Sequence, residues 1–325
     1  MAGGQERILR RRIRSVQATK KITRAMELIA ASRIVKAQAR VHAAQPYSDG
    51  ITEVVKDLAA AGAGAGNPLL EPRPTVKRVA NVVIAADRGL CGGYNASVIR
   101  AAEAEIKRHG AEGRDYMLVT VGRKPEGYFR FRDYRVDASF TGFTDAPSYE
   151  DARRVAAAVS KPFLDGEVDV VQIVYTRFVS AGRQEVVVCP LMPLDTEGFS
   201  GGDAKPAEAG AAYKFEPSPE TILDALLPRY AEARVYAALL NAAASEHAAR
   251  QRAMKAATDN ADELIRNLTR IMNRARQDAI TTEIMEIVGG AEALKTGTKA
   301  HAEALLEPRP IPTERDYFQP GHLSA

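Results

Sequence analysis

The sixty residues between Pro228 and Gly289 contain neither glycine nor proline. Within this run and the turn before it, mostly apolar side chains recur in steps of three and four, and none of them carries a full charge. Such a long seam predicts a coiled-coil helix of about 90 Å that requires a partner helix. The predicted seam consists of Leu223, Leu226, Tyr230, Ala233, Ala237, Leu240, Ala244, His247, Gln251, Met254, Thr258, Ala261, Ile265, Leu268, Met272, Ala275 and Ala279.

A second run without glycine or proline covers residues 5–45 and predicts a helix of about 60 Å. Gln45-Pro46-Tyr47 is expected to loosen this helix, which would resume as far as Leu58. Its apolar stripe shifts by one residue and then shifts back, a phase change that would keep contact with a partner winding around it. The stripe reads Leu9, Ile13 and Val16, then Ile22, Met26 and Ile29, then Ile34, Ala37 and Val41.

Between the two helices, short apolar runs alternate with helical stretches. We expect strands at Val79–Ala86, Met117–Val121, Val168–Tyr175 and Glu185–Cys189, with a helix to about Arg108 and another over 148–164. This alternation predicts a small Rossmann-like α/β domain with a largely parallel sheet. The predicted fold class is therefore an α/β protein in which two very long helices, one at each end of the chain, bracket that domain.

The expected division of the chain follows these elements. It comprises a helix at 1–60, a linker at 61–78, the α/β domain at 79–194, a surface loop at 195–217, a helix at 218–294 and a partly disordered extension at 295–325. In the long C-terminal helix, Ser218 is a suitable N-cap, and Pro228 is expected to kink or restart the helix.

The loop Asp87–Gly93, directly after the first strand, is the strongest candidate for a site within the domain. Its glycines could cradle a phosphate, yet no Walker lysine follows and no GxGxxG is completed. Cys91 has no histidine nearby in the sequence, and the five histidines show no metal-ligand spacing. We therefore expect a structural turn, with no catalytic, cofactor or metal site.

Charge is distributed unevenly. Residues 1–40 hold eleven Lys and Arg against two Glu, which would suit a nucleic-acid arm, but no aromatic residue interleaves with them. No apolar run approaches 18 residues, so we expect neither a membrane span nor a secretory signal. Because no aromatic residue interleaves with the basic residues, binding of nucleic acid is disfavoured.

Four stretches carry a family resemblance. They are KITRAMELIAAS (21–32), DRGLCGG (87–93), SEHAARQRAMKAATDN (245–260) and RARQDAITTEIMEIVG (274–289). In order and spacing they resemble the signatures of the γ subunit of the rotary, proton-translocating ATP synthase, most closely of actinobacterial members. Pro228 and the 31 residues after Leu294, which repeat LLEPRP (69–74) at 305–310, depart from that pattern.

The resemblance implies that the terminal helices form an antiparallel coiled coil, which serves as the non-catalytic central rotor of the ATPase complex. It would stand inside a ring of α and β subunits and couple ion flow through the c ring to ATP synthesis or hydrolysis on the β subunits. The α/β domain would dock on the ε subunit and the c ring, on the cytoplasmic side of a bacterial cell membrane. The implied contacts with the ring are Met26, Glu246, Arg250, Arg276, Gln277, Thr281 and Glu283.

Two other readings remain open from the residues alone. One is a soluble α/β enzyme that dimerises through its terminal helices and uses the Asp87–Gly93 loop. The other is a basic coiled-coil protein that binds chromatin or RNA.

Overall fold

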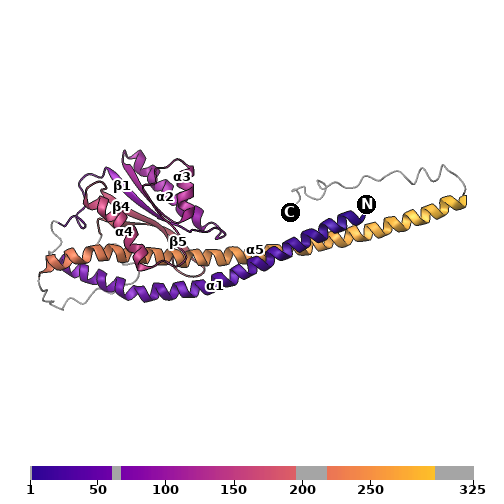
Figure 1. Cartoon of the computed structure of the whole chain (residues 1–325), viewed down its shortest axis with the longest axis horizontal. Coiled ribbons are helices and arrows are strands. Elements are labelled where there is room, and N and C mark those ends of the chain that lie inside the picture. Colours follow the sequence, from indigo (N-terminus) through magenta and orange to yellow (C-terminus); the bar gives the residue numbers. More distant parts are fainter. Residues whose placement is uncertain (1, 61–66, 195–217, 297–325) are drawn as a thin grey trace, which may run out of the picture. The chain divides into compact units, whose positions relative to one another are not determined.

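The computed structural model describes residues 2–60, 67–194 and 218–296 (Figure 1). The chain divides into two compact units, one of Met1–Thr19 with Ala261–Ala325 and one of Lys20–Asn260. The elements are α1 (Ala2–Ala60), β1 (Arg78–Ile84), α2 (Tyr94–Ala111), β2 (Asp115–Val121), α3 (Arg123–Phe131), β3 (Ala138–Phe140), α4 (Tyr149–Leu164), β4 (Val170–Phe178), β5 (Gln184–Met192) and α5 (Pro219–Thr296). The predicted surface loop at 195–217 and the tail beyond Thr296 lie outside the described residues.

Both long helices run through a proline. Pro46 lies inside α1 and Pro228 inside α5, so the loosening expected at Gln45–Tyr47 and the restart expected at Pro228 are wrong. An internal proline removes one backbone hydrogen bond and costs about 3 kcal/mol. Burial of side chains near each proline offsets that cost. After Pro46 the buried residues are Ile51, Val55 and Leu58, and on the two sides of Pro228 they are Leu223, Leu227 and Tyr230.

Within the described residues, five strands form one sheet in the order β3-β2-β1-β4-β5. β1 pairs in parallel with both β2 and β4, and only β5 is antiparallel, which confirms the largely parallel, Rossmann-like sheet. Sequence reasoning missed β3 and α3. β3 has three half-buried residues, and the short α3 contains both Pro125 and Gly127, so neither shows a clear periodic pattern.

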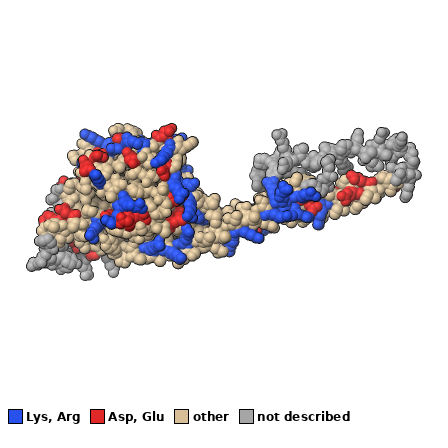
Figure 2. Space-filling view, in the orientation of Figure 1, with Lys and Arg blue, Asp and Glu red and all other residues tan. Residues whose placement is uncertain are grey.

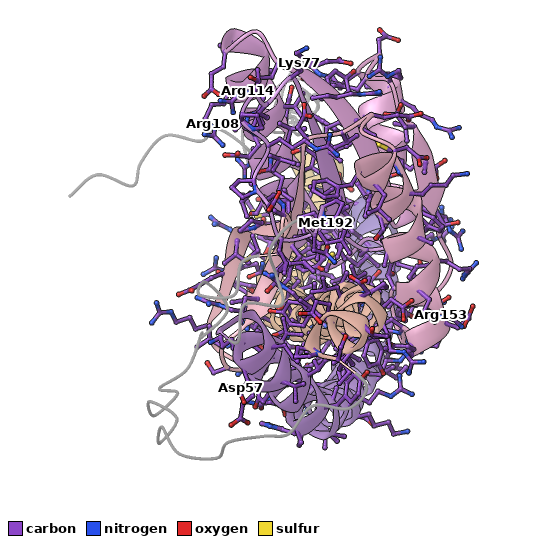
Figure 3. The ribbon with its side chains drawn as sticks, turned by 90° about the vertical axis from the view of Figure 1, so that its left-hand side faces the viewer. Asp57, Lys77, Arg108, Arg114, Arg153 and Met192 are labelled. Atoms are coloured by element: carbon purple, nitrogen blue, oxygen red, sulfur yellow. The ribbon has the colours of Figure 1, made fainter. Side chains whose placement is uncertain are left out.

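Each face of the sheet has its own core. On one face, β-strand side chains pack with α4, with the end of α1 and with Leu223–Ala242 of α5. On the other face they pack with α2 and α3. In Figure 3, Met192 lies in the interior, Asp57 of α1 lies at one end of this unit, and Lys77, Arg108 and Arg114 lie at the opposite end. The first half of α5 is therefore a core element of the domain as well as a coiled-coil helix.

Within the second unit, α1 and α5 run antiparallel. Thr23 and Thr258 share a buried hydrogen bond of 2.8 Å. Farther along α1, Leu58 joins the core cluster that contains Leu223 near the start of α5. Increasing residue numbers on α1 thus meet decreasing numbers on α5. Every predicted seam position on α5 is buried or half-buried, so that part of the prediction is confirmed.

The phase shift predicted for α1 is wrong. Ile22 and Ile29 are exposed, while one continuous series of buried or half-buried positions on α1 keeps unbroken steps of three and four. Those positions are Ile13, Val16, Lys20, Thr23, Glu27, Ala30, Ile34, Ala37 and Val41. The seam continues through polar residues because Thr258 provides a hydroxyl partner for Thr23 and Arg24 pairs with Glu27. The apolar residues Ile22 and Ile29 are thus left facing outward.

Candidate functional site

An exposed apolar surface lies on α1. Ile22, Leu28 and Ile29 are each more than half exposed, with Ile22 at 61%, and Met26 between them is half-buried. Large aliphatic side chains in a contiguous exposed group are typical of a contact surface for another protein. We call Ile22, Met26, Leu28 and Ile29 the α1 patch.

A second exposed surface covers the last described turns of α5, in the other unit. Every residue from Arg276 to Val288 except Ala279 is exposed, which includes the predicted contacts Arg276, Gln277, Thr281 and Glu283. The same turns expose Ile280, Ile284, Met285, Ile287 and Val288, with Ile287 at 72%. A helix that exposes aliphatic side chains around its circumference is suited to a surrounding partner.

Charge is also segregated in the unit formed by Met1–Thr19 and Ala261–Ala325. Figure 2 shows Lys and Arg gathered over α1 and the part of α5 beside it, and Asp and Glu over the later turns of α5. On α1 the exposed cations are Arg7, Arg10, Arg11, Arg12 and Arg14, whereas Asp278, Glu283, Glu286 and Glu292 follow one another on α5. A partner that encloses these turns would therefore meet positive charge beside α1 and negative charge at the later turns of α5.

Glu246 and Arg250 have different surroundings from the other predicted contacts. Glu246 is 1% exposed and Arg250 is 8% exposed, and their side chains form an ion pair of 2.7 Å. Burial raises the pKa of Glu246 to about 7, although Arg250 opposes that rise. Arg250 Nη2 also donates a hydrogen bond to the Gly89 carbonyl oxygen at 3.2 Å. Arg250 thus contacts the chain's own α/β domain and Glu246 pairs with Arg250, and the contact of both with a partner stays a prediction.

Asp87, at the start of the predicted loop site, is a buried hydrogen-bond acceptor. Its carboxylate accepts bonds from the backbone N–H groups of Arg123, Gly142 and Thr144 and from the Thr144 hydroxyl, at 2.9–3.2 Å. Burial acts to raise the pKa of Asp87, but these hydrogen bonds outweigh it and the pKa is lowered. Sequence reasoning placed Asp87 in a turn and missed its four donors, which come from segments distant in the chain.

The chemistry available in this loop is limited. Cys91 is buried, and that burial raises the pKa of its thiol, which disfavours the thiolate. A hollow of about 440 Å³ beside the loop is lined by Cys91–Tyr94, Ser97, Thr176, Gln184, Val186, Ala249, Arg252 and Ala253. That lining contains no carboxylate and no imidazole to serve as a general base.

Among residues 2–60, 67–194 and 218–296, no group of three or more His, Cys, Asp or Glu is arranged to hold a metal ion. Within the same ranges, no helix is long and apolar enough to cross a bilayer.

Comparison with known proteins gives a consistent picture. A family model described as ATP synthase matches residues 5–294. The ATP synthase gamma chain of Frankia casuarinae is 53% identical over 302 residues, which cover 91% of this chain and 99% of the relative. The gamma chain of Streptomyces avermitilis is 50% identical over 302 residues, covering 91% and 98%.

Solved structures share the fold. A chain from the Euglena gracilis mitochondrial ATP synthase (OSCP/F1/c-ring, rotational state 3) matches with a TM-score of 0.62 at 20% identity, covering 91% of this chain and 97% of that one. A chain from the Tetrahymena thermophila mitochondrial ATP synthase (central stalk/c-ring) matches with a TM-score of 0.54 at 24% identity, covering 73% and 99%.

Proposed function

Because the chain belongs to the family of ATP synthase γ chains, the central-stalk subunits of F-type ATP synthase, we propose that it is the rotor of such a complex. In this role it turns inside the ring of α and β subunits and couples ion flow through the c ring to ATP synthesis or hydrolysis. The observation that carries the proposal is the identity of about half of all residues over 91% of the chain. The exposed aliphatic turns of α5 provide a surface that such a ring would cover.

The proposed ring contacts lie on two surfaces. On α1 the contact is the α1 patch, centred on Met26, whose neighbours Ile22 and Ile29 are exposed. On α5 the contacts are Arg276, Gln277, Thr281 and Glu283, all of them exposed. The exposure of these side chains supports the assignment because a moving contact requires side chains that the chain's own fold leaves uncovered.

As a peripheral subunit of the F1 part, the chain would be attached to a membrane-bound complex. We place it at the cytoplasmic face of a bacterial cell membrane, because the similar gamma chains come from actinobacteria. We further propose that its α/β domain contacts the ε subunit and the c ring. All chemistry would then occur on the partner subunits, with no active site on this chain.

The proposed function is tested by purifying the complex from native membranes. Mass spectrometry of the intact complex should find one copy of this chain with α, β, ε and c subunits. Membranes from cells depleted of the chain should lose ATP-driven proton pumping. A homodimer that purifies without those subunits would instead support the soluble-enzyme reading, against which the family membership already argues.

Met26→Lys is expected to lower proton pumping more than ATP hydrolysis in the same membranes. A lysine in an otherwise apolar contact would pair with a ring carboxylate and stabilise particular rotor angles. A charge-assisted pair contributes about 1.5–3 kcal/mol, enough to slow a step about ten-fold. Ala39→Lys, which adds the same charge on an exposed position of α1 outside the patch, is the control. Equal losses in both activities would argue against this contact.

Cys91→Ser is expected to leave ATP hydrolysis by the assembled complex within about two-fold of wild type, at a stability cost of about 1 kcal/mol. The thiol is buried and its pKa is raised, so it acts as packing rather than as a nucleophile. The measurement is the specific activity of complex that contains a full complement of subunits. Loss of activity there would revive the enzyme reading.

A further inference from the structure

Between Ala242 and Arg250, α5 is joined to the α/β domain by four hydrogen bonds. The Tyr94 hydroxyl donates to the Ala242 carbonyl at 3.1 Å, and the Ser245 hydroxyl donates to the Thr176 carbonyl at 3.0 Å. His247 Nε2 lies 3.1 Å from the Asp145 carbonyl oxygen, and Arg250 Nη2 donates to Gly89 O at 3.2 Å. The domain's side of these bonds comes from four segments: the start of α2, strand β4, the loop before α4 and the Asp87–Gly93 loop.

The hydrogen bond from Arg250 to Gly89 depends on the buried ion pair between Arg250 and Glu246. Arg250 Nη2 donates to the Gly89 carbonyl and lies 2.7 Å from Glu246 Oε1 in an ion pair. Glu246 is 1% exposed, and within the described residues no donor makes a well-aligned hydrogen bond to its Oε1. The carboxyl group of Glu246 therefore has Arg250 as its cationic neighbour one helical turn away, and it holds the guanidinium in place. The desolvation free energy of a buried ion pair can exceed its Coulombic gain, so such a pair is weak evidence for a role in stability alone.

The loop that Arg250 contacts is held firmly on the domain side. Asp87 anchors its beginning through four accepted hydrogen bonds. At its end, Asn95 Oδ1 accepts a bond from the Ala86 N–H, and Asn95 Nδ2 donates to the Arg88 carbonyl. Leu90 and Gly92 both have positive φ values, 62° and 60°, which fix a compact turn. A displacement of the sheet would therefore displace Gly89 with it.

We propose that Glu246 and Arg250, together with Gly89, form a latch that fixes the α/β domain to α5 and transmits torque between them. The inference rests on the proposed rotor function and concerns how that rotor works internally. In the described residues the domain also meets α5 through apolar packing and through bonds of Glu232, Arg234, Asn241 and Arg252. The bond from Arg250 differs from these because a buried ion pair within α5 holds its donor. Arg250 is in this account a positioning residue, and its partner is the chain's own backbone.

The test compares two activities of the assembled complex. Proton pumping in membranes requires torque to pass between α5 and the domain, whereas ATP hydrolysis by the detached catalytic head does not load the domain. Arg250→Met keeps the length and apolar stem of the side chain but removes both contacts of the guanidinium. We expect the ratio of protons pumped to ATP hydrolysed to fall about three-fold or more, because loss of a charge-assisted bond shifts an attachment equilibrium about ten-fold.

Two matched variants accompany it. Arg250→Lys keeps the charge and a donor, so it should recover part of the lost ratio. Lys255→Met removes a cation from an exposed position of the same helix and should leave the ratio unchanged. If Arg250→Met lowers pumping and detached-head hydrolysis in parallel, Arg250 acts on the ring and the latch is wrong. An unchanged ratio in Arg250→Met overturns it as well.

A disulfide that replaces the lost Arg250 bond distinguishes a mechanical role of Arg250 from a contact with the ring. A Cβ at Gly92 would lie 3.8 Å from the Ala253 Cβ, a separation typical of a disulfide. Gly92→Cys with Ala253→Cys, in the Arg250→Met chain with Cys91→Ser, should restore the pumping ratio when oxidised and lose it again when reduced. The reduced form also controls for strain at the positive φ of residue 92. Formation of the disulfide without rescue contradicts the latch.

Failure of the latch and failure of the rotor function give different results. If membranes depleted of the chain still pump protons on addition of ATP, the proposed function is wrong whatever the variants do. If depletion abolishes pumping while Arg250→Met behaves as wild type, the chain remains the rotor and only the latch is rejected.

Discussion

Gly122→Ala is expected to prevent stable folding of the α/β domain. Gly122 links β2 to α3 at a φ of 105°, a region that is almost confined to glycine. A Cβ there would lie 2.4 Å from the Ala85 carbonyl oxygen and 3.0 Å from two further backbone carbon atoms. These neighbours belong to the chain that follows β1, so they cannot move aside as a flexible side chain would.

The expected cost is about 3–5 kcal/mol, from backbone strain and the displacement of packed backbone, out of a total stability of about 5–15 kcal/mol. Urea unfolding of the purified chain and the yield of assembled complex measure the effect. Gly127→Ala, inside α3 with no atom within 4 Å of the new Cβ, is the control and should be neutral or slightly stabilising. A Gly122→Ala chain with an unchanged urea midpoint would contradict the geometry described for this turn.

Asp87→Asn is expected to destabilise the domain by about 2–4 kcal/mol at neutral pH. Oδ1 accepts from the Arg123 N–H, and Oδ2 accepts from the Gly142 N–H, the Thr144 N–H and the Thr144 hydroxyl. An amide presents its NH₂ group to N–H donors in either orientation, so at least one donor is left buried and unpaired. The yield of assembled complex should fall as well, because the same carboxylate anchors the Asp87–Gly93 loop.

The pH dependence of this variant follows from the lowered pKa of Asp87. An acid whose pKa is lower in the folded chain stabilises it above the unfolded pKa, and that contribution is lost as pH falls through the folded value. The difference between wild type and Asp87→Asn should therefore be largest at neutral pH and shrink below about pH 4. The difference is measured from urea midpoints at neutral pH and below about pH 4, with Asp165→Asn, at an exposed position, as the control. A difference that stays constant with pH would show that the charge is not responsible.

The sequence predicts the long helices and the parallel sheet well, because both depend on patterns repeated many times. The seam of α5 is one such pattern, and the apolar run around Val82 and Val83 in β1 is another. It does not predict that α1 and α5 continue through Pro46 and Pro228, because the compensating burial comes from residues distant in the chain. A single helical periodicity also cannot show that Ala231–Ala242 packs in one core with both the end of α1 and the sheet.

The candidate site is predicted less completely. Exposure of Arg276, Gln277, Thr281 and Glu283 agrees with their proposed role as contacts, which stays a prediction. The phase of α1 was misjudged because Ile22, Met26 and Ile29 look like a core stripe, whereas the helix buries Thr23 and Glu27 instead. Polar residues on a seam are recognisable only when their partners, such as Thr258, are known.

The rotor account is tested most directly at Ile22, whose side chain is 61% exposed within the α1 patch. A photoreactive benzoylphenylalanine at this position, irradiated in the assembled complex, should form a covalent bond to an α or β subunit. Because a bonded shaft cannot turn within the ring, ATP hydrolysis should fall in proportion to the cross-linked fraction. Cross-linked complex that hydrolyses ATP at the rate of unlinked complex, or a cross-link that never includes a ring subunit, would contradict the account.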